Sequence, residues 1–161
     1  MRAARGVSQT PQLRHPPIKD VGYRWGCDWA GGFASGEAKH TGSDTFGHKH
    51  LFVCIEYTSK WVEVWPAREK TAEVSAYLFR MLVVSRFGAP AEVITDGGPE
   101  FQGEFRDYLK ESLIDQRYIT PGNPQSNGQA ERVVQMIKNS LRKMGTDGLA
   151  TGRTWDRAIM A

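Results

Sequence analysis

The chain has 161 residues, enough for one domain with a substantial core, and its 40% hydrophobic and 24% charged residues are an ordinary globular composition. No apolar run approaches the roughly 20 residues of a membrane helix and no signal peptide is recognisable, so we expect neither a membrane protein nor a secreted one. The net charge of +3 arises within residues 1–20, which hold four cations and one carboxylate. Such an arm indicates a polyanionic partner, although many chain termini are basic.

Residues 1–20 also contain three prolines and are predicted to form a basic arm or linker. Residues 21–161 are then the folded domain. Its sequence stops six residues after Trp155, where another helix is predicted to start, so we expect the domain to be truncated at its C-terminal end. Cys27 and Cys54 fall in predicted strands without metal-ligand spacing, which predicts buried free thiols.

The first part of the domain has the pattern of strands. Val21–Phe33 is an aromatic-rich strand candidate with Asp28 in its middle. A carboxylate there is costly unless hydrogen bonds or a bound cation stabilise it. After a polar, glycine-containing loop, His50–Tyr57 and Trp61–Ala67 are predicted to pair as an antiparallel hairpin.

A helix and a short strand follow. Thr71 is predicted to cap a helix that extends to Phe87 and ends at Gly88. Glu92–Thr95 is predicted to be a strand that brings Asp96 to its carboxyl end. Because ligands of open α/β sheets gather at the carboxyl ends of strands, Asp96 is a candidate functional residue.

The last part of the chain alternates between helix and strand. Phe101–Leu113 is predicted to be an amphipathic helix and Gln116–Thr120 the final strand. A loop containing proline and glycine covers residues 121–128, and a long helix is predicted from Ala130. The order strand, hairpin, helix, strand, helix, strand, helix predicts an α/β fold, with a mixed sheet and helices on its faces.

The predicted long helix carries two stripes. The apolar stripe consists of Val133, Val134, Ile137, Leu141 and Met144. The polar stripe lies roughly 140° away around the helix axis and consists of Glu131, Gln135, Lys138 and Arg142. Taken alone, a polar stripe is more often a solvated face. The loop before it and the acids upstream favour a functional interpretation.

Four stretches of the sequence occur together, in this order, in one known family. They are Trp25-Gly-Cys-Asp28, Thr58-Ser-Lys-Trp61, Ile94-Thr-Asp-Gly-Gly-Pro-Glu-Phe101 and Asn123-Pro-Gln-Ser-Asn-Gly-Gln-Ala-Glu-Arg132. On these motifs, which span most of the domain, the chain resembles the catalytic core of retroviral and LTR-retrotransposon integrases, which belong to the DDE recombinase superfamily.

The resemblance implies an RNase H-like fold: a five-stranded mixed sheet whose first three strands are antiparallel, with helices on both faces. It places Asp28 on the central strand, Asp96 on its parallel neighbour and Glu131 on a helix beside them, as a catalytic, metal-binding triad. In-line attack on a phosphodiester develops charge on two oxygens, which two Mg²⁺ (or Mn²⁺) ions about 3.5–4 Å apart stabilise together. The implied activity is 3′-end processing and DNA strand transfer.

The implied partners are DNA, both the element's own ends and a target duplex. Candidate contacts lie in the loop and on the polar stripe: Gln125, Asn127, Gly128, Gln135, Lys138 and Arg142. Integrase cores generally dimerise through helices, so a homodimer or higher multimer is expected. Its expected location is the nucleus when it acts on host DNA, and otherwise a cytoplasmic element particle.

Two alternatives remain open. The same triad could serve an RNase H-like nuclease or a bacterial-type DDE transposase, because hydrolysis and transesterification use the same carboxylates; the Pro-Gln-Ser-Asn-Gly loop favours a recombinase. The second alternative is a non-catalytic integrase remnant that binds DNA or protein. Glu56, at the end of a predicted strand, is the fallback acid if one member of the triad is misassigned.

Overall fold

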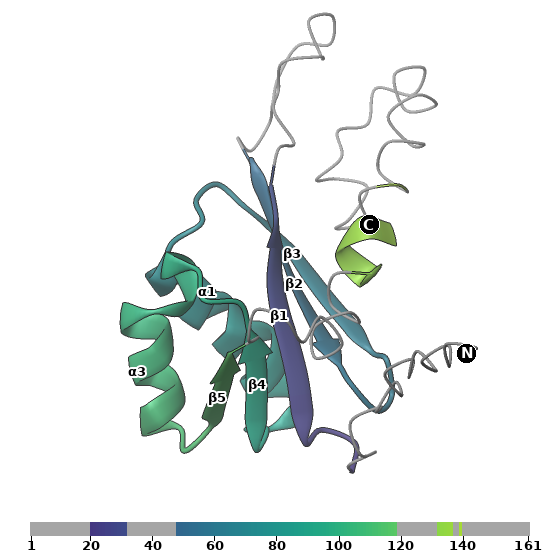
Figure 1. Cartoon of the computed structure of the whole chain (residues 1–161), viewed down its shortest axis with the longest axis vertical. Coiled ribbons are helices and arrows are strands. Elements are labelled where there is room, and N and C mark those ends of the chain that lie inside the picture. The colour runs from purple at the N-terminus through teal and green to yellow at the C-terminus, as the bar shows by residue number, and fades with distance from the viewer. Residues whose placement is uncertain (1–19, 32–47, 119–131, 137–138, 140–161) are drawn as a thin grey trace, which may run out of the picture.

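The computed structural model describes residues 20–31, 48–118, 132–136 and 139. Within them, five strands form one mixed sheet in the order β3-β2-β1-β4-β5 (Figure 1). The strands are β1 (Arg24–Ala30), β2 (His50–Glu56), β3 (Val62–Ala67), β4 (Glu92–Thr95) and β5 (Asp115–Tyr118). The first three strands pair antiparallel, whereas β4 runs parallel to both β1 and β5. The predicted mixed sheet, with β1 at its centre, is therefore confirmed.

Besides the helical residues 132–136, five helical elements of the described region follow β3 and β4. They are α1 (Ala72–Phe79), a π-helical segment η1 (Arg80–Val84), α2 (Ser85–Phe87), a 3₁₀ turn η2 (Pro99–Phe101) and α3 (Gly103–Glu111). None of the described helices has the length and apolar composition that crossing a bilayer requires.

The predicted helix between Thr71 and Gly88 forms, but it is not uniform. The Thr71 hydroxyl accepts the Val74 N–H at 3.3 Å, as expected of a cap, and Gly88 ends the helix with a φ of 85°. The prediction of one regular helix is wrong at η1. There, both the N–H and the hydroxyl of Ser85 donate to the Arg80 carbonyl, five residues back. This side-chain bond competes with regular helical pairing and favours the wider turn.

Alternation along β1 separates two faces of the sheet. Trp25, Cys27 and Trp29 enter the main core, together with side chains of α1, η1 and α3. Figure 1 shows α1 and α3 on this side. Ala30 lies on the other face, in a cluster with Leu51, Val53 and Val134. Because residues 132–136 are helical, the predicted coverage of both faces by helices is confirmed for the described residues.

The two cysteines are free and buried, as predicted. Cys27 in β1 is the direct cross-strand partner of Cys54 in β2, and their sulfurs lie 3.4 Å apart. The predicted arm falls outside the described residues except for Asp20, as do the C-terminal residues 140–161. The division into arm and domain therefore stays a prediction.

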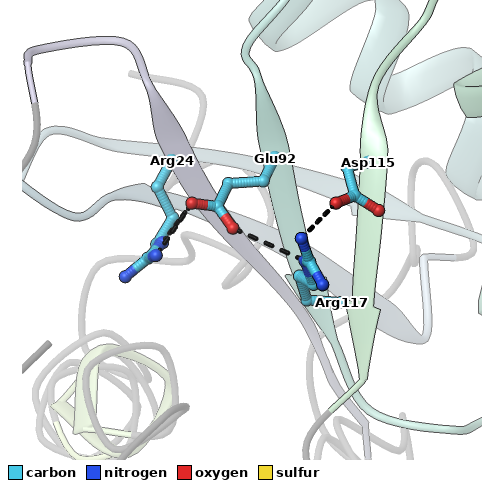
Figure 2. Close-up of polar contacts among 4 residues, drawn as sticks. All are labelled: Arg24, Glu92, Asp115 and Arg117. Atoms are coloured by element: carbon cyan, nitrogen blue, oxygen red, sulfur yellow. Dashed lines mark hydrogen bonds and ion pairs between the residues drawn. The ribbon is translucent and has the colours of Figure 1, made fainter.

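An ion-pair network joins β1, β4 and β5 at the amino ends of these three parallel strands (Figure 2). The Glu92 carboxylate receives Arg24 at 2.8 Å and Arg117 at 3.7 Å. Arg117 also contacts Asp115 at 2.5 Å. The register pairs Arg24 with Glu92 and Glu92 with Asp115, so one row of charges crosses three strands on a single face. We call this set the amino-end network.

Candidate active site

The strand register brings the first two predicted acids to the same level. In the parallel pair β1 and β4, Arg24 lies opposite Glu92 and Gly26 opposite Ile94. Continuing this register by two residues places Asp28 level with Asp96, the residue that follows β4. Adjacent strands lie about 4.8 Å apart, so the two acids are near neighbours at the carboxyl ends of parallel strands.

The two acids also share a face of the sheet. Asp28 follows Arg24 by four positions and Asp96 follows Glu92 by four, so both continue the face that carries the amino-end network. Val53, the cross-strand partner of Asp28, clusters with Val134. The described helical residues 132–136 therefore pack on the same face as Asp28.

A backbone N–H group of a nearby residue donates to each of these two acids. The half-buried Asp28 accepts the Trp29 N–H at 2.7 Å, and the exposed Asp96 accepts the Gly98 N–H at 3.0 Å. Within the described part of the chain, Asp96 makes no ion pair. Two neighbouring carboxylates with solvent access are hard oxygen donors of the kind that Mg²⁺ prefers. The residues present therefore fit a divalent cation.

Glu131 lies outside the described residues, as do Gln125, Asn127, Gly128, Lys138 and Arg142. Among the described residues, no three His, Cys, Asp or Glu side chains come together as a metal-binding group. The triad as a whole thus stays a prediction. Of the predicted DNA contacts, the structure describes Gln135, which is exposed and donates to the Asn139 side chain at 3.0 Å along the helix.

The fallback acid, Glu56, does not belong to this site. It lies opposite Trp25, three residues from Asp28 along β1 or roughly 10 Å, and alternation puts it on the other face of the sheet. Its side chain is buried and accepts N–H groups of Gly22, Thr58 and Ser59. Burial raises the pKa of this carboxyl, but the hydrogen bonds outweigh burial and hold it below its ordinary value. Glu56 therefore caps the turn between β2 and β3.

One residue near the site, Gln116, was not predicted from the sequence. Gln116 of β5 donates from its side-chain amide to the Thr95 hydroxyl and to the Phe101 carbonyl, on either side of Asp96. No motif marks it, because a polar residue in a short strand has no signature of its own. Only the parallel pairing of β4 with β5, which sets Gln116 against Val93, brings it to the loop.

A mixed five-stranded sheet with two acids level on adjacent parallel strands defines the class of integrase-like, RNase H-type folds. The family model for the integrase core domain matches residues 21–124. The chain belongs to this family.

Curated relatives are retroviral polyproteins. The chain is 35% identical over 140 residues to the Pol polyprotein of Radiation murine leukemia virus (strain Kaplan), covering 86% of this chain and 23% of that protein. It is 32% identical over 110 residues to the Gag-Pol polyprotein of Avian reticuloendotheliosis virus, covering 68% of this chain and 9% of that protein. The chain thus spans less than a quarter of the length of these relatives.

Solved structures share the fold. The simian T-cell lymphotropic virus intasome in complex with PP2A regulatory subunit B56 gamma matches with a TM-score of 0.62 at 22% identity, over 86% of this chain and 48% of the other. The HTLV-2 integrase catalytic core domain, in complex with magnesium and in a trimeric form, matches with a TM-score of 0.61 at 24% identity, over 86% and 80%. The predicted integrase-core fold is confirmed.

Proposed function

We propose that this chain is the catalytic core of an LTR-element integrase, a polynucleotidyl transferase that trims DNA 3′-ends and joins them to a target duplex. The observation that carries the proposal is the shared level and shared face of Asp28 and Asp96 at the carboxyl ends of β1 and β4. A single carboxylate in a strand has many structural explanations. Two that meet at the ligand-binding edge of a sheet have few.

Asp28, Asp96 and Glu131 would hold two Mg²⁺ or Mn²⁺ ions. Bound there, such ions stabilise charge on the entering and leaving oxygens of the phosphodiester. The Gly98 N–H donates to one oxygen of Asp96, which restricts the orientation of that carboxylate. For Glu131, support comes from Val133 and Val134, close after it in sequence, which pack against the sheet face that carries Asp28. The magnesium in the HTLV-2 core agrees with this donor set.

DNA would approach this same face, along the loop and helix that carry the predicted contacts. Gln125, Asn127 and Gly128 would meet the element ends, and the stripe of Gln135, Lys138 and Arg142 would meet phosphates. Gln135 is exposed on its helix, which supports a polar stripe that is accessible to DNA. Phosphate contacts release counterions, so Lys138→Ala should lower the slope of log K against log salt by roughly 0.9. If the salt slope of Lys138→Ala were unchanged, the polar stripe would be only a solvated face of the helix.

Self-association would use the opposite side of the molecule, which carries α1. Large apolar side chains are exposed on β3, before it, and on the helix beside it: Trp61, Trp65, Tyr77, Met81 and Phe87. Apolar residues exposed together mark protein interfaces more often than free surface. A monomer at high concentration in analytical ultracentrifugation would contradict this part of the proposal.

Strand transfer on model DNA ends in Mg²⁺ or Mn²⁺ tests the function. Asp28→Asn, Asp96→Asn and Glu131→Gln should each lower activity at least roughly 100-fold, because second-shell substitutions alone can cost 10–100-fold. Asp107→Asn, an exposed acid on α3, is the matched control and should leave activity unchanged. A triad variant that keeps more than about a tenth of the activity would remove its residue from the site. Cleavage of RNA–DNA hybrids without strand transfer would identify a nuclease instead.

A further inference from the structure

Gln116 ties together the two ends of the segment that carries Asp96. Its side-chain N–H groups donate to the Thr95 hydroxyl at 3.1 Å and to the Phe101 carbonyl at 2.8 Å. Thr95 immediately precedes Asp96, and Phe101 ends the η2 turn that follows it. Both residues are fully buried, so one amide group joins the entry and the exit of segment 96–100 at fixed points.

The orientation of this amide is determined by a third contact. The Tyr118 hydroxyl donates to Oε1 of Gln116 at 3.0 Å, so the oxygen faces Tyr118 and the nitrogen faces the Asp96 segment. Backbone pairing already holds β5 against β4 from Asp115 to Tyr118. The Gln116 side chain is therefore available to fix the segment rather than the strand.

Inside the segment, the backbone leaves little freedom. The Gly98 N–H donates to Asp96, and the Gly98 carbonyl accepts the Phe101 N–H at 3.0 Å. The buried Glu100 carboxylate lies so close to Gly98 that a Cβ there would come within 2.6 Å of it. Glu100 also pairs with Lys70 at 2.5 Å. A turn braced in this way transmits any shift of its two ends to Asp96.

We propose that Gln116 is a positioning residue for Asp96, which fixes the Asp96 carboxylate for divalent-metal binding without contacting the metal. The inference rests on the proposed role of Asp96 as a metal ligand. Ligating carboxylates lose affinity when their supporting hydrogen bonds are removed, typically by about 10–100-fold. Gln116 supports the backbone on both sides of this ligand, and its loss changes metal affinity more than it changes the fold.

The test compares Gln116→Met, which keeps length and removes the amide, with Gln102→Met as the matched control. Gln102 lies at the exit of the same segment, and its side-chain oxygen accepts the Tyr118 hydroxyl at 3.4 Å. Its substitution therefore removes a contact with the same tyrosine but leaves in place the Gln116 amide that holds Thr95 and Phe101. Mn²⁺ binding to the full chain, followed by electron paramagnetic resonance, gives the affinity without DNA. Gln116→Met should weaken Mn²⁺ binding about 10-fold, and Gln102→Met should leave it unchanged. Equal affinities in wild type and Gln116→Met, with only a lower melting temperature, would make Gln116 purely structural and overturn the proposal.

Gln116→Glu adds a readout that a general packing defect would not produce. When ionised, this side chain cannot donate to the Phe101 carbonyl; when protonated, it regains one O–H donor. Its loss of Mn²⁺ affinity relative to wild type should therefore shrink as the pH falls toward the ordinary Glu pKa of about 4.3. A loss that is independent of pH would count against the donor role.

Two further variants keep the outcome interpretable. If Gln116→Met does not fold, Thr95→Val removes one acceptor with little change of shape, and unchanged Mn²⁺ affinity in it would refute the proposal. Asp96→Asn is measured in parallel. If it retains Mn²⁺ affinity and strand transfer, the role of Asp96 fails and the inference fails with it. If Asp96→Asn loses both while Gln116→Met loses neither, only the inference fails.

Discussion

The two ends of the parallel strands use carboxylates in opposite ways. At the amino ends, Glu92 is held between Arg24 and Arg117, and the buried Glu56 nearby accepts three backbone N–H groups. At the carboxyl ends, Asp28 and Asp96 lie level with each other. The ring of Tyr57 covers Gly26 between the two regions, at a point where a Cβ would come within 2.7 Å of that ring. The sheet therefore carries acids in two different settings, at the two ends of its parallel strands.

The difference separates acids that stabilise the fold from the acids that we propose as metal ligands. Where cations and N–H groups of the chain satisfy a carboxylate, its loss leaves buried partners unsatisfied, and stability falls. If two neighbouring carboxylates bind a cation together, the cation relieves their repulsion, so neutralising one of them should cost little stability in metal-free solution.

The largest effect is expected at Glu56. Glu56→Ala leaves the N–H groups of Gly22, Thr58 and Ser59 without this acceptor. It should therefore lower the free energy of unfolding by about 3–5 kcal/mol. Urea denaturation followed by circular dichroism measures the change. Glu111→Ala, an exposed acid at the end of α3, is the control and should change stability by less than about 0.5 kcal/mol. Equal effects of the two substitutions would remove Glu56 from the stabilising group.

A smaller loss is expected in the amino-end network. Glu92→Gln keeps the shape of the side chain but removes its charge from Arg24 and Arg117, which should cost about 2 kcal/mol. Asp115→Asn offers an internal comparison, because Asp115 and Arg117 are more than half exposed. It should cost less than about 1 kcal/mol. If Asp115→Asn proved the more damaging, burial would not be what makes this network stabilising.

At the carboxyl ends, metal should stabilise the fold. Mg²⁺ at ten times its dissociation constant should add about 1.4 kcal/mol to wild type, which differential scanning fluorimetry records as a rise of a few degrees. Asp96→Asn should match or exceed the metal-free stability of wild type and lose this rise. A variant that was destabilised without metal yet still responded to Mg²⁺ would place Asp96 with the structural acids.

The mildest effect is expected in the pH dependence of stability. Burial and hydrogen bonds act in opposite directions on the Glu56 carboxyl, and its pKa in the folded state is lowered from an ordinary value of 4.5. The stabilisation this provides is fully present above pH 4.5 and is lost as pH falls through the folded-state pKa. Glu56→Gln should therefore flatten the decline of stability below pH 4.5. If the free energy of unfolding fell with pH in this variant as steeply as in wild type, other carboxylates would be responsible for the decline.

Local signals in the sequence were sufficient to predict most secondary-structure elements and the family. Alternation, helical periodicity and turn residues are local signals, so the strand around Asp28, the hairpin and the strand that ends at Asp96 could all be predicted. The motifs were sufficient to name an integrase core. Boundaries were predicted less well: β1 begins at Arg24 rather than Val21, because Asp20–Tyr23 forms a hydrogen-bonded turn that includes Gly22 at positive φ.

Which acids become neighbours depends on how the strands pair in the folded chain. Residues 68 positions apart, such as Arg24 and Glu92, are brought together by parallel pairing, and the register of that pairing leaves no local trace in the sequence. The β1–β4 register puts Asp28 level with Asp96. The antiparallel β1–β2 register puts Glu56 on the other face, and the β4–β5 register sets Gln116 beside the Asp96 segment. A shift of one residue would reverse the faces, so the site depends on packing between strands that are distant in sequence.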